Sequence, residues 1–116
     1  MMRTRAQDWS KRSFEAVSAQ KGDVTGKYRT ACMRMPGLIH QSGLLQAVVF
    51  VLARDEQGER YVTDVAGALT PGEDHAALIA RAQSAGLAEY LALTRDVLEV
   101  TQWLRRFAQI ELRDAS

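Results

Sequence analysis

Small and apolar side chains recur every three or four residues near the start of the chain, between residues 3 and 21. The positions that share this face are Ala6, Trp9, Ser13, Ala16 and Val17. Lysine, arginine and glutamate occupy the other faces, so the pattern predicts an amphipathic helix. Gly22 is expected to end this helix. Asp23 or Thr25 is expected to accept hydrogen bonds from the first free amides of a second helix, which runs to about Arg34.

The segment Met35-Pro36-Gly37 interrupts the helical pattern. Proline lacks an amide hydrogen and disfavours helical angles at the preceding residue, so we expect a break or a sharp kink here. The apolar side chains that follow are Leu38, Ile39, Leu44, Leu45, Val48, Val49 and Leu52. They predict a central buried helix, in which Gly43 lets a neighbouring helix approach its backbone closely.

The same region has an alternative interpretation as a β-hairpin. Residues 47–52 and 61–65 are rich in β-branched side chains and flank a polar segment at residues 55–58. An isolated two-stranded hairpin is only marginally stable in water, and we find no further strand pattern in the chain. We therefore favour helices for this stretch.

A helix start is predicted at Thr70-Pro71-Gly72-Glu73. Thr70 is expected to cap the helix, with Pro71 at its first position and Glu73 returning the capping-box hydrogen bond. Gly86 closes this short, alanine-rich helix. The longest helical pattern then runs from Leu87 to about Arg113 without proline or glycine.

The last predicted helix has two distinct faces. Its core face comprises Tyr90, Leu93, Thr94, Val97, Val100, Thr101 and Leu104. Its polar face is centred on Arg95, Glu99, Gln102, Arg106 and Arg113. Trp103 and Ile110 project toward the polar side, and Phe107 joins them to the core face. Apolar side chains beside charged ones in this way indicate a surface for a partner.

These patterns predict an all-α protein, a compact bundle of about five to six helices with a long C-terminal helix. The composition agrees, since hydrophobic residues make up 47% and charged residues 25% of 116 residues, and only two are prolines. The length suits a single domain over residues 1–116. The net charge of +1 does not by itself indicate nucleic-acid binding. Contact with RNA would therefore depend on where the basic side chains lie.

The only cysteine, Cys32, cannot form an internal disulfide, and the first residues lack the apolar centre of a signal peptide. The longest apolar run, residues 47–53, is far shorter than the roughly 18 residues that span a membrane. We therefore expect a cytoplasmic protein without a membrane segment.

Several short motifs occur in an order that resembles a known family. They are Tyr28, Ala31, Met35-Pro36, Ile39, Ser42-Gly43-Leu44, Gln46-Ala47, Phe50, Tyr90, Thr94, Leu98 and Trp103-Leu-Arg-Arg-Phe-Ala108. Together they resemble the small fifth subunit of the Cmr complex, the type III-B CRISPR RAMP module. Residues 56–86 carry no matching motif. Ser42 stands where the family often has asparagine, and the middle of the chain lacks the second aromatic anchor of many members.

The resemblance implies a non-catalytic helical subunit of an RNA-guided antiviral effector. In that family, several copies stack alongside the filament of RAMP subunits and help to line the path of the target RNA. The implied partners are therefore RAMP backbone subunits, the large subunit, further copies of the chain, the CRISPR RNA and the target RNA. No cofactor is implied.

Candidate RNA contacts are arginines and lysines that two helices would present together. On the last helix they are Arg95, Arg105, Arg106 and Arg113, and on the first Arg5, Lys11 and Arg12. Arg105 and Arg106 point about 100° apart on a helix. Arg106 is the better candidate for a phosphate, because a guanidinium donates two parallel hydrogen bonds. The alternative is a surface of mixed charge, since Asp8, Glu15 and Glu99 dilute the basic stripe.

Trp103, Phe107 and Ile110 are candidates for contact with a neighbouring subunit, because large aromatic side chains bury much area with few rotatable bonds. For Phe107, burial in the protein's own core is the favoured interpretation.

The sequence is less consistent with two other classes of function. A helix-turn-helix regulator of DNA would use the helix after Pro36 for recognition, but that helix is too apolar for a major groove. A small hydrolase would need a nucleophile with its base, and neither Cys32 nor His40 has an acid at a suggestive spacing. Glu73-Asp74-His75 is more typical of a charged helix start than of a metal site. We therefore predict neither an enzyme nor a metal site.

Overall fold

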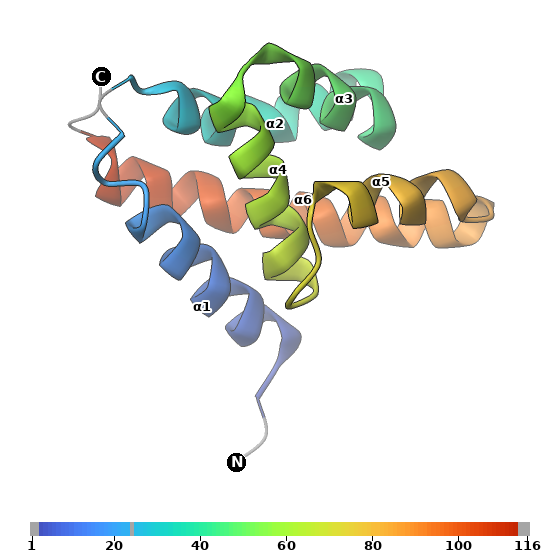
Figure 1. The fold of residues 1–116 in the computed structure, drawn as a ribbon. Helices are drawn as coiled ribbons and strands as arrows, with labels where there is room; N and C mark the ends of the chain where they lie inside the picture. Colours follow the sequence, from blue (N-terminus) through green and yellow to red (C-terminus); the bar gives the residue numbers. More distant parts are fainter. Residues whose placement is uncertain (1–2, 24, 114–116) are drawn as a thin grey trace.

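The computed structural model describes residues 3–23 and 25–113, and within them the chain forms six α-helices and no strand (Figure 1). The helices are α1 (Arg5–Ser18), α2 (Lys27–Ser42), α3 (Leu44–Arg54), α4 (Glu56–Leu69), α5 (His75–Ser84) and α6 (Leu87–Glu111). The all-α prediction and the long C-terminal helix are confirmed. The predicted domain limits at residues 1 and 116 lie outside the described residues.

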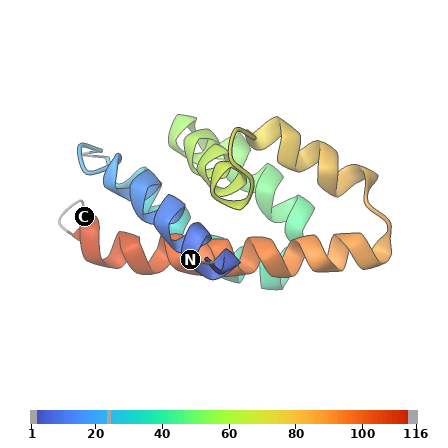
Figure 2. The same ribbon diagram turned by 90° about the horizontal axis from the view of Figure 1, so that it is seen from below.

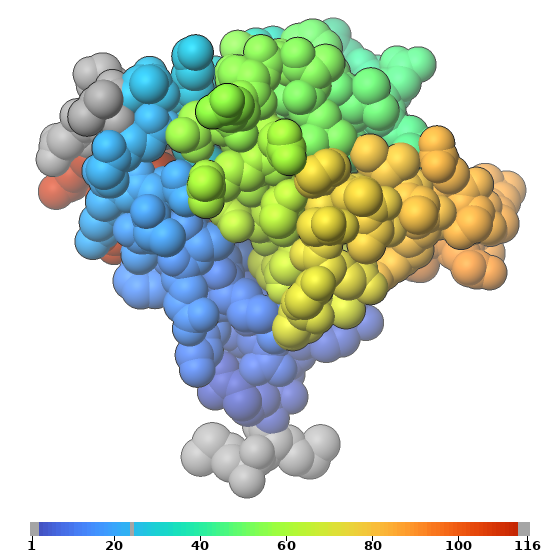
Figure 3. All heavy atoms as spheres, viewed as in Figure 1, coloured from blue at the N-terminus to red at the C-terminus, as the bar shows by residue number. Residues whose placement is uncertain are grey.

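Helix α6 is the base on which the other helices pack. It runs along one side of the molecule, and α1, α2 and α4 contact it at different points along its length (Figures 1 and 2). α5 packs against α3 and α4 instead. In the view of Figure 1, α1, α4 and α5 lie on the near face of the molecule and hide most of α6 (Figure 3). Arg95, Glu99 and Arg106 of α6 are exposed, so the rest of the described chain leaves this side of the helix uncovered.

One hydrophobic core joins all six helices. Its largest fully buried side chains are those of Tyr28, Tyr61, Met35, Leu44, Leu78, Leu104, Val17, Val48, Val51, Val62, Val65 and Val97. Five of the seven residues of the predicted core face of α6 are buried, and the other two, Tyr90 and Thr94, are half-buried. The hydroxyl of buried Thr101 donates to the carbonyl of Leu98 at 2.9 Å, so this polar group has a partner.

The predicted break at Met35-Pro36-Gly37 is wrong. α2 continues through Pro36, whose side chain is buried on the core side of the helix. An interior proline costs a helix about 3 kcal/mol or more. α2 offsets that cost by burying Tyr28, Cys32 and Ile39 along the same side. The helix therefore survives because of tertiary packing, which the local pattern does not report.

The chain turns at Gly43 instead, and this residue alone separates α2 from α3. Gly43 has φ 85° and ψ 165°, a conformation that residues with a side chain rarely adopt. The single central helix predicted from residue 38 is therefore two helices. Gly43 has no side chain to cap α3, and the Tyr90 hydroxyl of α6 accepts a hydrogen bond from the Leu45 amide at 3.1 Å.

Helices α3 and α4 replace the alternative hairpin, as the helical interpretation predicted. Asp55 lies between them and accepts a hydrogen bond from the Gly58 amide at 2.8 Å, which caps α4. A Cβ atom at Gly58 would lie 2.1 Å from the Val51 carbonyl oxygen. The close backbone approach that we predicted at Gly43 therefore occurs at Gly58, while a Cβ at Gly43 would meet nothing within 4 Å.

The helix start predicted at Thr70 is also wrong. Thr70 ends α4, and its carbonyl accepts a hydrogen bond from the Glu73 amide at 3.2 Å. Pro71 and Gly72 thus occupy the centre of a turn, with Gly72 at φ 87°. Asp74 caps α5 through the Ala77 amide, and Gly86 precedes α6 rather than ending α5, which stops at Ser84.

Asp23 and Thr25 accept hydrogen bonds from the first amides of α2, as the sequence predicted, although the residue before the helix is Gly26. The Asp23 carboxylate accepts from the Tyr28 amide at 3.2 Å, and the Thr25 hydroxyl accepts from the Lys27 amide at 3.2 Å. α1 ends at Ser18, so the chain from Ala19 to Gly22 forms turns rather than helix. Thr4 and Gln7 form a capping box at the start of α1.

Candidate functional site

The outward face of α6 carries exposed arginines. Arg95 and Arg106 are exposed and eleven residues apart, about three turns, so their side chains leave the same side of the helix. Arg113 is also exposed but lies two residues beyond the end of α6. None of the three forms an ion pair within the described residues. We call these three residues the arginine face; Glu99, also exposed, lies within it and reduces its charge.

Arg105 differs from its neighbour Arg106. It is half-buried, and its Nε atom is buried without a hydrogen-bond partner among the described residues. The two guanidinium groups therefore start from different sides of α6, as the helical geometry predicts.

The basic residues of α1 do lie beside α6, since the two helices pack together. Arg5 forms an ion pair with Asp96 of α6 at 2.8 Å, and its guanidinium lies 4.6 Å from the centre of the Trp9 ring. Arg12 donates from Nε to the Ala68 carbonyl at 2.8 Å, which ties α1 to the end of α4. Lys11 is exposed and forms no ion pair within residues 3–23 and 25–113. Of the three predicted contacts on α1, two thus already serve the fold.

Aromatic side chains line the border between α1 and α6. Trp103 and Phe107 stack with centroids 5.9 Å apart, and the ring of Phe14 meets Phe107 edge-on at 5.3 Å. Ile110, which is 61% exposed, continues the apolar surface along α6. The guanidinium of Arg106 lies 5.8 Å from the centre of the Trp103 ring. We call Phe14, Trp103, Phe107 and Ile110 the aromatic surface, and it adjoins the arginine face.

Phe14 was not among the residues predicted for this surface. It is 42% exposed and lies off the core side of α1, which buries Trp9, Ser13 and Val17. The sequence could have indicated this contact, because Phe14 is an aromatic residue that lies outside the apolar side of the predicted first helix. Only the packing of α1 on α6 shows that it meets Phe107.

A buried polar cluster joins α2 to α4. The Tyr28 hydroxyl donates to the Asp64 carboxylate at 2.6 Å, and the rings of Tyr28 and Tyr61 meet edge-on at 5.7 Å. Burial raises the pKa of Asp64, while the hydrogen bond from Tyr28 and the charge of Arg60 act in the opposite direction. Burial also raises the pKa of the Cys32 thiol well above its usual range. A buried, protonated thiol is a poor nucleophile, so Cys32 serves packing.

The Asp64 carboxyl makes stability depend on pH in a defined direction. Folding raises the pKa of Asp64 above its value in the unfolded chain. The protonated carboxyl therefore stabilises the fold fully at a pH below the pKa of the unfolded chain, and this stabilisation is lost as the pH rises through the pKa of the folded protein. Asp64→Asn keeps a neutral acceptor for Tyr28 at every pH. In urea unfolding, we expect this variant to be at least as stable as the parent at pH 7 and to show a weaker dependence on acid pH.

Tyr28→Phe is the matched variant for that measurement. It removes the hydrogen bond that lowers the pKa of Asp64, so the loss of stability between acid and neutral pH should become larger. An Asp64→Asn variant less stable than the parent at pH 7 would contradict this account.

The segment Glu73-Asp74-His75 is occupied by structural contacts. Glu73 forms an ion pair with Arg81, Asp74 caps α5, and the His75 Nδ1 atom lies 2.9 Å from the Thr63 hydroxyl. Across residues 3–23 and 25–113, no three histidine, cysteine or acidic side chains converge as metal ligands would. In the same residues, no helix combines the length and apolar character needed to cross a membrane.

A single helical core, with an aromatic and an arginine-bearing surface on its longest helix, defines a small all-helical protein. The chain belongs to the Cas_Cmr5 family of CRISPR-associated proteins, whose model matches residues 5–111. The resemblance found in the sequence is thereby confirmed. The match spans residues 56–86, in which the sequence motifs gave no sign of the family.

Two matches from Thermus thermophilus agree with this assignment. The chain is 38% identical over 109 residues to a curated protein described as CRISPR system Cmr subunit Cmr5, with 93% of this chain and 96% of that protein covered. The crystal structure of a CRISPR-associated Cmr5 family protein from the same species matches with a TM-score of 0.90. That match is also 38% identical and covers 96% of this chain and 99% of the other.

Proposed function

We propose that this protein is a non-catalytic, cytoplasmic subunit of a type III-B CRISPR Cmr effector complex. In this role it stacks alongside the RAMP backbone filament together with further copies of itself and contacts the large subunit. Its arginine face lies near the path of the target RNA that pairs with the CRISPR RNA. Family membership over residues 5–111 supports a place in such a complex.

The observation that carries the RNA contact is the arginine face. Arg95 and Arg106 are exposed on one side of a single rigid helix and have no carboxylate partner in the described chain. Guanidinium groups held in this way can donate to phosphate oxygens without first breaking an internal ion pair. Arg113 and Lys11 are also exposed and form no ion pair in the described chain, while Arg5, Arg12 and Arg105 are less available for the reasons given above.

The aromatic surface supports a protein contact beside the RNA contact. Stacked and edge-on rings fix the positions of Trp103 and Phe107 before binding, so little side-chain entropy is lost when a neighbour covers them. Helix α6 thus presents the aromatic surface to a neighbouring protein and the arginine face to RNA.

Arg106→Ala tests the RNA contact. We expect the assembled complex to bind target RNA roughly fivefold more weakly, which corresponds to about 1 kcal/mol. The slope of log affinity against log salt should fall by about one, as for the loss of one phosphate contact. Binding isotherms at several salt concentrations, normalised to the amount of subunit incorporated, measure both quantities.

Arg60→Ala is the matched control, because Arg60 is exposed on α4 and not on α6. It should leave affinity and salt slope unchanged. Equal effects of the two variants, or no effect of Arg106→Ala in a fully assembled complex, would remove the arginine face from the RNA path.

A further inference from the structure

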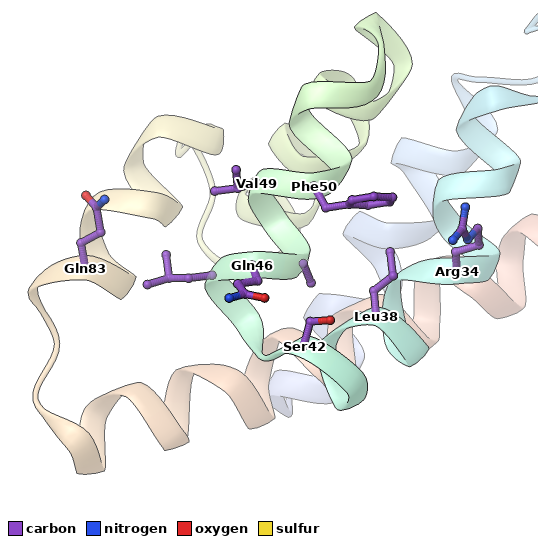
Figure 4. A pocket seen from close by; sticks show the side chains of 9 residues that line it. Arg34, Leu38, Ser42, Gln46, Val49, Phe50 and Gln83 are labelled. Carbon is purple, nitrogen blue, oxygen red and sulfur yellow. The ribbon is translucent and has the colours of Figure 1, made fainter.

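A second surface lies away from the aromatic surface, where α2 and α3 meet the end of α5. A groove of about 650 Å³ opens there. Figure 4 shows Leu38 on α2, Val49 and Phe50 on α3, and Gln83 across the hollow on α5. The side chains of Val49 and Phe50 are 53% and 47% exposed. The groove therefore presents apolar side chains to solvent where no helix of the described chain covers them.

Two arginines flank the aromatic end of this groove. The guanidinium groups of Arg34 and Arg54 each lie 5.8 Å from the centre of the Phe50 ring. Both residues are exposed, and neither forms an ion pair with a carboxylate within residues 3–23 and 25–113. The groove is therefore complementary to a partner segment that carries both apolar side chains, for its floor, and acidic side chains, for the two arginines.

We propose that this groove binds an amphipathic helix of a different protein of the complex. Aliphatic side chains of that helix pack against Leu38 and Val49, and its carboxylates pair with Arg34 and Arg54. The walls of the groove are helices rather than strands. They offer no edge for strand addition, so recognition depends on side chains, as in helix-in-groove binding.

RNA fits this groove less well. The guanidinium groups already lie over the Phe50 ring, so a base would have to displace them to stack. Of the nine lining residues, four are aliphatic, three are neutral and polar (Ser42, Gln46 and Gln83) and one is a cation, Arg34. With Arg54 beside Phe50, the groove has two positive charges, both at its aromatic end. A path for a phosphate backbone needs a longer row of positive charge.

A second copy of this chain also fits less well. α6 exposes aliphatic side chains in two places, Leu87 with Leu91 and Ile110, and each place lies four residues from an arginine, Arg95 and Arg106 respectively. Placing either in the groove would bring those arginines toward Arg34 and Arg54. Like charges in an interface oppose association.

A photo-crosslinking amino acid in place of Gln46, an exposed residue that lines the groove, tests the proposal in the complex purified from its host. We expect a crosslink to another protein, mapped by mass spectrometry to a segment with helical apolar spacing and at least two acidic residues. A crosslink mainly to RNA, mainly to a second copy, or to nothing in a fully assembled complex would overturn the proposal.

Paired substitutions make the test quantitative. Val49→Glu and Arg34→Glu should each lower the yield of that crosslink about tenfold, since interface hot spots commonly contribute about 1.4 kcal/mol or more. Leu91→Glu is the control, because Leu91 is 55% exposed like Val49 but lies outside the groove. Equal yields from all three variants would overturn the proposal. Arg106→Ala should leave this crosslink intact, so loss of the RNA contact and loss of the groove contact can be told apart.

Discussion

Gly58→Ala is expected to destabilise the fold by about 2–3 kcal/mol, as overpacking does in a core that cannot expand. The added Cβ would lie 2.1 Å from the Val51 carbonyl oxygen and 3.1 Å from its carbonyl carbon. Both atoms belong to the backbone of α3, so no side chain can rotate away. α3 and α4 would have to separate and open the packing around buried Val51 and Val62. Urea unfolding followed by circular dichroism measures the change.

Gly67→Ala is the control on the same helix. A Cβ there would approach the Glu73 carbonyl oxygen at 3.6 Å, an ordinary contact distance. Because alanine is the better helix former, this variant should match the parent or gain up to about 1 kcal/mol. Similar losses for the two variants would show that loss of glycine, rather than helix approach, controls stability at Gly58.

Trp103→Glu is expected to reduce incorporation into the Cmr complex about thirtyfold, which corresponds to the roughly 2 kcal/mol of an interface hot spot. The substitution removes the ring that stacks on Phe107 and places a carboxylate on the aromatic surface. Competition between tagged parent and variant subunits during reconstitution, read by quantitative mass spectrometry, gives the ratio directly.

Trp103 is half-buried, so its replacement also affects the fold, and a second variant separates the two effects. Ile110 is 61% exposed, and Ile110→Glu should leave the free energy of unfolding within about 0.5 kcal/mol of the parent. We still expect it to lower incorporation, by less than Trp103→Glu. Normal incorporation of Ile110→Glu together with a folded, normally incorporated Trp103→Glu would exclude the aromatic surface as an interface.

Much of the α6 region could be predicted from sequence, because the spacing of residues along a helix fixes the side on which each side chain lies. Seven residues spaced for one side gave the core face, and the same geometry placed Arg95 and Arg106 together on the other. The family resemblance was predictable for a related reason, since each of its motifs is a short run of neighbouring residues. Whether the arginines touch RNA stays a prediction, tested by Arg106→Ala.

Contacts between helices could not be predicted in this way. Nothing near Arg5 or Arg12 in the chain shows that Asp96 and the Ala68 carbonyl would engage them. Phe14 likewise joins the aromatic surface only because α1 packs against α6. The turn at Thr70 and the cap at Asp74 were misplaced because Pro71-Gly72 suits the first turn of a helix and a tight turn almost equally.

The sequence by itself determined that this protein is helical, which side of its last helix is buried, and to which family it belongs. These properties follow from helical spacing and from short motifs of neighbouring residues. Only the tertiary structure decided that α2 runs through Pro36, that α3 meets α4 at Gly58, and that an apolar groove opens beside Phe50. Each depends on the free energy and geometry of packing between helices, which local spacing does not encode.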